Sequence, residues 1–500
     1  MKTDQTNPKN NSIEETEQYQ DGAEANKLLR RSGLRLFAGP LSVLLAMVGS
    51  GLQGYANGTV DASFVALLLL VAGIVVVSLL FPGKKPEMRA FMLTYGVCVF
   101  AGGLAQCYSL AVFHNPQSTS DAVNSFFPNI QSQPPFASMA DRFTFIESTL
   151  PIVIWQQVYK LTWFFGLDYG PYIGVMFNAL VIAITGSITV RTARELYGDD
   201  AWRLRRVGTL FAFCGLFILF GAVLIRDCFT TFINALALWG IVRWLVRPTP
   251  LNLFGAVVAT GIGAWTMFYL REAATVMFGF YAFLALLFYV LRDRFKRTAL
   301  IYMMMVLSVL IMAMPYFLAF LSTAKTYQTR SNEGYTYQSE DQMADDSLAM
   351  RLIVRQTMPV RLVVGSGFLM VFPMPLWAYL HRGANDYLLI KTWHGLFQVF
   401  VIPLIIAAFF TIIHLFRCNQ QKIMPLIFLV VYLLLNWLAV VATSMEQRHL
   451  AQFMPAFLIL AAVPDMRDGE TQRRVRRIAV RWFTLVALLH GLWMVLKALI

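Results

Sequence analysis

Charged residues are scarce in this sequence. Asp, Glu, Lys and Arg together make up 14% of its 500 residues, whereas 57% are hydrophobic. A soluble domain carries about 25% charged residues, so this composition excludes one. Apolar runs of about 20 residues, the length that a helix needs to cross a bilayer, recur along nearly the whole chain. Barrel strands would be shorter and would alternate. The predicted fold class is therefore an all-α polytopic membrane protein.

Motifs for nucleotide and zinc chemistry are also lacking. The chain has no Walker loop, no G-x-G-x-x-G after a strand and no H-E-x-x-H. These absences argue against ATP-driven, nucleotide-dependent and zinc-peptidase activities. The five cysteines are odd in number, scattered and mostly inside apolar runs, so they indicate neither a disulfide framework nor a metal site. The spans leave no room for the cytoplasmic globular domain of a soluble nucleotide-sugar transferase.

The basic residues occur in short clusters between the apolar runs. A net charge of +13 suits nucleic acid in principle, but this distribution is the positive-inside pattern, so we expect the bilayer and no nucleic acid as a partner. Residues 1–34 are predicted to be a disordered cytoplasmic tail, because their first part is polar with almost nothing to bury. Residues 35–500 form a single transmembrane domain in this interpretation. The expected location is the bacterial cytoplasmic (inner) membrane, with the N-terminus in the cytoplasm.

The alternation of basic clusters predicts about thirteen spans. They include residues 36–55, 64–80, 91–113, 172–190, 207–225, 228–242, 300–321, 393–416, 425–441, 450–463 and 482–499. Two long outer loops are expected, residues 114–170 and 322–392. The first contains an interfacial helix over 151–166, with Trp155, Tyr159 and Trp163 on one face.

Residues 360–380 are apolar enough to be a further span. Counting them as one would place the last basic cluster, 467–477, outside the cell. We therefore interpret 360–380 as a re-entrant or interfacial hairpin, broken at Phe372-Pro373-Met374-Pro375, where closely spaced prolines cannot continue a helix.

Two charged steps lie at span ends. Arg226-Asp227 separates the uncharged runs 207–225 and 228–242, and Arg271-Glu272 follows an apolar run on the same predicted face. Ionisable groups at membrane depth are costly unless they are paired or hydrated, so such steps are functional candidates. The alternative is a pair of neutralised, snorkelling turns.

The unusual charges of the outer face converge in this topology. They are Asp121, Arg226, Asp227, Arg271, Glu272, Arg351, Glu446 and Arg448. Arginines match phosphate oxygens by bidentate donation, and a carboxylate can take the proton of an acceptor hydroxyl. A polyprenyl-phosphate sugar, half lipid and half polar, suits such a face.

Several segments together resemble a known family. They are Ser120-Asp121-Ala122, VRTARELYGDDAWRLRRVGTLFAF over 190–213, LIRD over 224–227, VFPMPLW over 371–377, and Glu446-Gln447-Arg448-His449. In this order they resemble the GT-C superfamily of multispanning glycosyltransferases, most closely its family-39-like, mannosyltransferase-type members.

The resemblance implies transfer of a sugar from a polyprenyl-phosphate donor to a glycan, lipid or protein acceptor on the outer membrane face. A carboxylate of the first outer loop, Asp121, would be the base. The sequence departs from the family because this loop follows the third span and because Asp121 lacks an adjoining Glu. Asp141 and Glu147 in the same loop are alternatives.

The candidate catalytic residues are thus Asp121 and Asp227. The candidate substrate-binding residues are Arg226, Arg271, Glu272, Arg351, Glu446 and Arg448. No cofactor is expected, and a requirement for a divalent cation stays open. A Wzy-type polysaccharide polymerase, a lipid-linked oligosaccharide flippase or transporter, and a structural membrane partner are the other readings.

Overall fold

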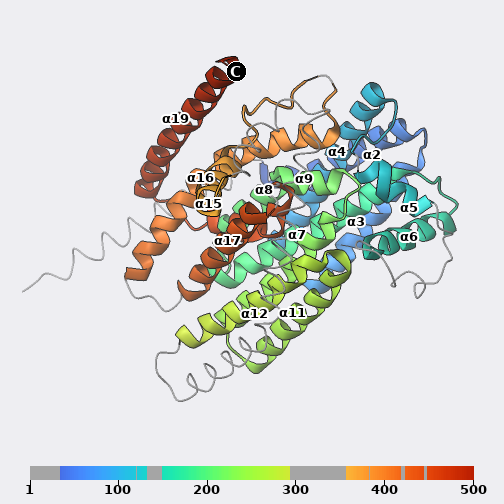
Figure 1. Ribbon diagram of the computed structural model, residues 1–500. Helices are drawn as coiled ribbons and strands as arrows, with labels where there is room; N and C mark the ends of the chain where they lie inside the picture. The colour runs from blue at the N-terminus through green and yellow to red at the C-terminus, as the bar shows by residue number, and fades with distance from the viewer. Residues whose placement is uncertain are drawn as a thin grey trace, which may run out of the picture.

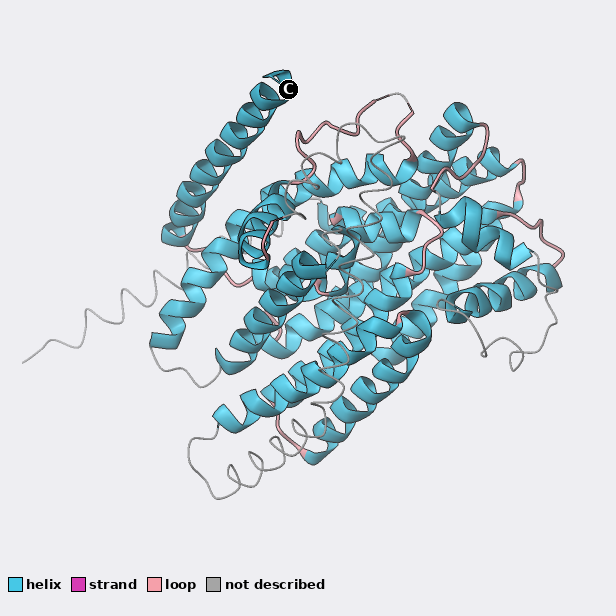
Figure 2. Cartoon of the chain, viewed as in Figure 1, coloured by secondary structure: helices cyan, strands magenta, loops and turns pink. Residues whose placement is uncertain are grey.

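The computed structural model describes residues 34–119, 121–131, 149–292, 356–381, 383–417, 423–443 and 447–499. Within these ranges every regular element is a helix and no strand occurs (Figure 2), which confirms the all-α class. Several predictions fall outside the described residues: nearly all of the N-terminal tail, the span 300–321, and Ser120, Asp141, Glu147, Arg351 and Glu446.

The helices follow one another with short connections. Their bounds are α2 Leu34–Asn57, α3 Asp61–Leu80, α4 Lys85–Phe113, η1 Ala122–Phe126, α5 Phe127–Gln131, α6 Thr149–Phe164, α7 Pro171–Tyr197, α8 Ala201–Phe213, α9 Gly215–Ala222, α10 Asp227–Val246, α11 Pro250–Leu270, α12 Glu272–Arg292, α15 Met358–Val371, α16 Asp386–Arg417, α17 Met424–Thr443, η4 Gln447–Gln452, α18 Met454–Ala461 and α19 Gly469–Leu499.

Eight of the described helices are long and apolar enough to cross a membrane: α3, α4, α7, α10, α11, α16, α17 and α19. The pair α8 and α9, bent by 54° at Cys214, makes a ninth crossing if it counts as one broken span. The protein is therefore a multi-pass helical membrane protein. The number thirteen stays a prediction.

Helix α7 forms the interior of the bundle, and 89% of its most apolar window is buried. Helices α2 and α4 pack closely beside it because glycines meet at their contact. A Cβ added to Gly103 would come within 2.4 Å of the Gly49 carbonyl oxygen. Membrane helices associate through such small residues, since lipid offers no hydrophobic drive to bring helices together. By contrast, α19 lies along one side of the bundle and is mostly exposed (Figure 1).

Helix α10 defines the two ends of the bundle. Its 20 residues span about 30 Å at 1.5 Å per residue. Asp227 begins the helix, and Arg247, just past its last residue, pairs with Glu195 of α7 at 3.3 Å. The antiparallel helix α11 returns the chain, so that Arg271 lies 3.7 Å from Asp227. The two charged steps therefore share one end, which we call the Asp227 end, and the opposite end is the Glu195 end.

A helix, α6, occupies the region predicted as helical over 151–166, but two of the three aromatic side chains on its predicted face point into the bundle. Trp155 and Tyr159 are fully buried, and only Trp163 is exposed. The indole of Trp155 donates to Asn178 at 2.9 Å, and the Tyr159 hydroxyl donates to the Gly170 carbonyl at 2.9 Å. Aromatic spacing alone does not distinguish a neighbouring helix from lipid, and here the neighbour is α7.

The segment predicted as a broken hairpin is interrupted where expected. Helix α15 ends at Val371, directly before Phe372-Pro373-Met374-Pro375. Its 14 residues extend about 21 Å, short of the ~30 Å hydrocarbon core, so this helix does not cross alone.

The span predicted over 450–463 has a different local structure. The chain there forms the 3-10 helix η4 and the eight-residue helix α18, with every residue of α18 buried. One end of this segment contacts the Asp227 end through His449, and the other contacts the Glu195 end of α7, where the Tyr197 hydroxyl donates to the Ile459 carbonyl. The segment runs between the two ends, but as a buried, interrupted element.

Candidate functional site

An irregular stretch between α9 and α10 shapes the Asp227 end. Residues 223–226 are not helical, so their carbonyls need partners from elsewhere. The buried amide of Asn178 supplies them, because its Nδ2 donates to the carbonyls of Val223 and Ile225 at 3.0 and 3.1 Å. Its Oδ1 accepts from the Trp155 indole. Helices α6 and α7 thereby fix the position of the charged step.

Asp227 is the first residue of α10 and its side chain is buried. An anion is favoured there by the unpaired N–H groups and the dipole of a helix N-terminus. Arg271 is an ion-pair partner, because its Nη1 lies 3.7 Å from Oδ1 of Asp227. That distance is an ion pair but not a hydrogen bond. Among the described residues, Oδ1 has no hydrogen-bond donor.

Arg271 occupies the corner between α11 and α12 and contacts both Asp227 and His449. Its Nη2 lies 2.7 Å from Nε2 of His449 in η4. A guanidinium has donors only, so Nε2 accepts and the proton of the neutral imidazole lies on Nδ1. Arg271 therefore connects the buried Asp227 with η4.

Asp121 lies on the open side of the same region. Its Oδ2 accepts a hydrogen bond from Nη1 of Arg448 at 2.7 Å, and 45% of the Asp121 side chain is exposed. The loop before it is tied to α16, because the Thr119 hydroxyl donates to the buried Asp386 carboxylate at 2.5 Å. The Asp386 N–H in turn donates to the Ser118 hydroxyl at 3.1 Å. Asp121 is thus exposed yet held in place.

Asp121, Asp227, Arg271, Arg448 and His449 form what we call the Asp227 cluster. The structure therefore brings together four of the predicted residues from four separate stretches of the chain. Arg226 is the partly buried residue immediately before α10. Glu272 begins α12 at the corner, but its side chain is not described, and Arg351 and Glu446 lie outside the described residues.

Three residues that build this site are not among those predicted from the sequence. His449 belongs to the segment Glu446-Gln447-Arg448-His449, and its position next to Arg448 is the only signal for it. Asn178 and Asp386 gave no signal that separates them from other polar residues at helix positions. Each serves the site through a partner more than 40 residues away.

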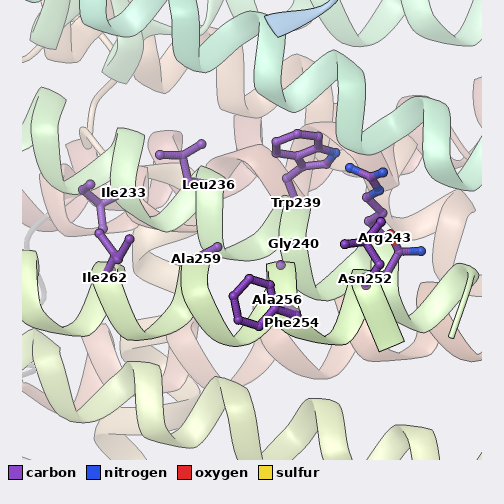
Figure 3. Close-up of a pocket in the computed structure, with 13 residues that line it drawn as sticks. Ile233, Leu236, Trp239, Gly240, Arg243, Asn252, Phe254, Ala256, Ala259 and Ile262 are labelled. Atoms are coloured by element: carbon purple, nitrogen blue, oxygen red, sulfur yellow. The ribbon is translucent and has the colours of Figure 1, made fainter. Parts of the chain in front are cut away.

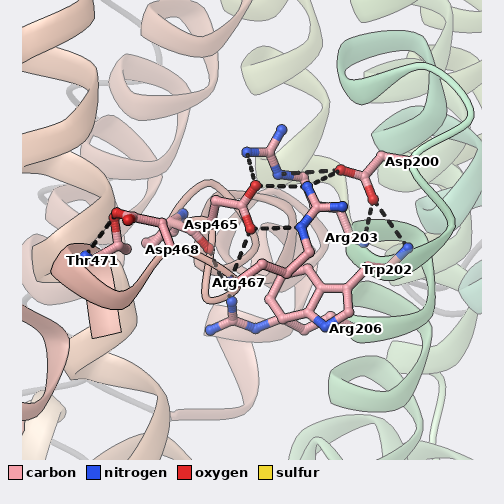
Figure 4. A network of polar contacts seen from close by, with 9 residues as sticks. Asp200, Trp202, Arg203, Arg206, Asp465, Arg467, Asp468 and Thr471 are labelled. Atoms are coloured by element: carbon pink, nitrogen blue, oxygen red, sulfur yellow. Dashed lines mark hydrogen bonds and ion pairs between the residues drawn. The ribbon is translucent and has the colours of Figure 1, made fainter. Parts of the chain in front are cut away.

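A second charge cluster lies at the Glu195 end and consists of Asp200, Arg203, Asp465 and Arg467; we call it the Asp465 cluster (Figure 4). Asp200 caps α8 by accepting from the N–H groups of residues 202 and 203. Arg467 donates to Asp465 at 2.6 Å and to Asp200 at 2.9 Å. The hydrogen bonds from Arg467 lower the pKa of Asp465 to about 2.

The described residues contain no group of three or more His, Cys, Asp or Glu side chains able to hold a metal ion. No family model, curated protein or solved structure matches the chain. The interpretation of the site therefore depends on its own chemistry. Its arginines can bind an anion, Asp121 can accept a proton from an incoming hydroxyl, and Asp227 can hold Arg271 in position.

Proposed function

We propose that the protein is a membrane glycosyltransferase. It moves a sugar from a polyprenyl-phosphate-linked donor to an acceptor on the outer face of the cytoplasmic membrane, in cell-surface glycan assembly. The observation that carries the proposal is the convergence of arginines, carboxylates and a histidine at the Asp227 end, from positions 121, 227, 271 and 448–449. Lone snorkelling charges would instead lie apart, each with its own route to water.

The depth of the cluster fits a lipid-linked phosphate. Asp227 and Arg271 occupy helix ends, where the apolar part of each span stops. The phosphate of a polyprenyl donor lies at the same boundary, with its chain in the bilayer and its sugar in water. In this proposal Arg226 and Arg271 bind the phosphate, and Asp227 neutralises Arg271 when no donor is present.

The exposed carboxylate supplies the base. Asp121 removes the proton of the acceptor hydroxyl, whose oxygen bonds to the anomeric carbon of the sugar. The bond from that carbon to the phosphate oxygen breaks, and polyprenyl phosphate leaves with its negative charge facing the arginines. Arg448 holds Asp121 in place before the acceptor arrives.

Reconstitution tests the proposal. The purified protein is placed in liposomes with a synthetic polyprenyl-phosphate hexose labelled in the sugar, together with membrane extract as a source of acceptors. We expect label to move from the lipid to a product that no longer partitions with polyprenyl phosphate. Formation of long ladders from a lipid-linked oligosaccharide would indicate a polymerase, and movement of intact donor across the bilayer without transfer would indicate a flippase.

A matched pair of substitutions on α10 adds a test of the site. Arg226→Lys keeps the charge but loses the planar guanidinium, which donates two parallel hydrogen bonds to a phosphate, so donor binding should weaken. Arg247→Lys makes the same change at the other end of the same helix, where Arg247 pairs with Glu195, and should leave donor binding unchanged. Equal donor affinity in both variants would remove Arg226 from the site.

A further inference from the structure

A groove of about 430 Å³ runs between α10 and α11, within the size range of small-molecule sites. Its lining is almost entirely apolar (Figure 3). Ile233 and Leu236 of α10 and Ala259 and Ile262 of α11 line its long part. Ile262 is 58% exposed. None of its lining residues belongs to the Asp227 cluster.

Small residues create the groove. A Cβ at Gly240 would lie 3.2 Å from the Ala256 Cα, so the helix backbones approach closely at its floor. Gly255 also lines the groove, but a Cβ added there would meet nothing within 4 Å. The groove is therefore open space above a close contact between the two helices.

A cation marks one end of the groove. Arg243 lies one turn before the end of α10, at the Glu195 end, and is partly buried. Its guanidinium lies 5.8 Å from the centre of the Trp239 ring. No ion pair of Arg243 is found within the part of the chain that the structure describes. The Trp239 Nε1 beside it is buried and has no acceptor among those residues. An apolar groove thus ends at a positioned arginine and an unsatisfied donor.

We propose that this groove binds one anionic phospholipid. An acyl chain lies along Leu236 and Ala259, and the headgroup phosphate pairs with Arg243 at the membrane boundary. Charge complementarity favours this occupant over a neutral lipid, because a guanidinium binds phosphate oxygens by bidentate, charge-assisted hydrogen bonds. The proposal is independent of the glycosyltransferase activity, since the groove and the Asp227 cluster share no residue.

Native mass spectrometry of the full-length protein tests the site. The protein in detergent is titrated with an equimolar mixture of dioleoyl phosphatidylglycerol and dioleoyl phosphatidylcholine. We expect one phosphatidylglycerol to bind in preference. Arg243→Gln should weaken that binding about tenfold, the scale of losing a hydrogen-bonded charged partner. Arg477→Gln, which removes an exposed arginine of α19, is the matched control and should bind as wild type does.

A second pair of substitutions tests the apolar part without changing charge. Gly255→Leu should fill the groove and abolish the tightly bound lipid. Gly261→Leu is on the same helix with equally open space, does not line the groove, and should leave the lipid bound. Equal binding of the two lipids, or undiminished phosphatidylglycerol in both Arg243→Gln and Gly255→Leu, would overturn the proposal. A dimer that Gly255→Leu dissociates would show instead that a second copy covers the groove.

Discussion

The two charge clusters both pair aspartates with arginines at opposite ends of the bundle, but they differ in how completely their carboxylates are paired. In the Asp465 cluster, Asp465 receives several hydrogen bonds from Arg467, and Asp200 accepts from two backbone N–H groups and from Arg467. In the Asp227 cluster, one oxygen of a buried aspartate has a cation at 3.7 Å and no described donor. The carboxylates of the Asp465 cluster are thus hydrogen-bonded as in a structural network, whereas the buried carboxylate of the Asp227 cluster keeps an oxygen without a described donor, which calls for an explanation.

The largest predicted effect is a loss of sugar transfer on substitution in the Asp227 cluster, which the Asp465 cluster should not show. Asp121→Asn keeps the shape of the side chain but removes the proposed base, so sugar transfer should fall by about a hundred- to ten-thousand-fold while donor still binds. Labelled-donor transfer and donor binding are measured on the same preparation. The control is Asp168→Asn, at another carboxylate of the same end that accepts from the Thr59 hydroxyl. Transfer at the normal rate in Asp121→Asn would leave the catalytic role of the cluster without support.

The next effect concerns the buried member of the Asp227 cluster. Arg271→Gln leaves Asp227 charged and buried without its cation, which should lower the free energy of unfolding by about 3 kcal/mol. Adding Asp227→Asn should restore most of this loss, because the unpaired charge is then gone. Thermal unfolding in detergent measures both variants. Additive losses in the double variant would show that the two residues do not form a pair.

A smaller loss is expected from the Asp465 cluster, and it should affect stability alone. Asp200→Ala removes the cap of α8 and the bond to Arg467, at a cost of about 1–2 kcal/mol. Asp200→Ser keeps a capping oxygen and should lose less. Transfer per folded molecule should stay at the wild-type level in both variants. A fall in that specific activity would contradict the separation of roles between the two ends.

The smallest effect is a dependence on acidity. The pKa of Asp465 in the folded protein is lowered from 3.8 to about 2. Its contribution to stability is therefore fully present above pH 3.8 and is lost as the pH falls from there towards 2. The unfolding temperature of wild type minus that of Asp465→Asn should shrink over this window. A difference that stays constant from pH 5 to pH 2 would show that the ion pairs of Asp465 do not stabilise the fold.

Hydropathy predicted much of the fold because it reports where chain leaves water. It placed helices at α3, α4, α7, α10, α16 and α17, and the proline pair marked the end of α15. It could not tell lipid from protein as the apolar neighbour. The helix with Trp155 and Tyr159 therefore looked interfacial although these two side chains are buried inside the bundle, and η4 with the fully buried α18 looked like one continuous span.

The site was predictable as a face but not as a set of contacts. The alternation of basic clusters along the chain predicted that four residues share one side of the membrane: Asp121, Asp227, Arg271 and Arg448. It did not indicate that Asp227 pairs with Arg271, 44 positions away, or that Asp121 pairs with Arg448, 327 positions away. Such partners depend on which helices are neighbours. That information lies in packing details such as the Gly49 and Gly103 contact rather than in hydropathy.

The segment formed by η4 and α18 couples the rotational position of one cluster about the helix axis to that of the other. Arg448 and His449 precede α18, Asp465 and Arg467 follow it, and no exposed residue of α18 lies between them to absorb a change in length. A single residue inserted into α18 would turn everything on one side of the insertion by about 100° about the helix axis. Both clusters cannot keep their partners after such a turn. The number of residues in this segment is therefore constrained by two sets of contacts, one at each end of the bundle.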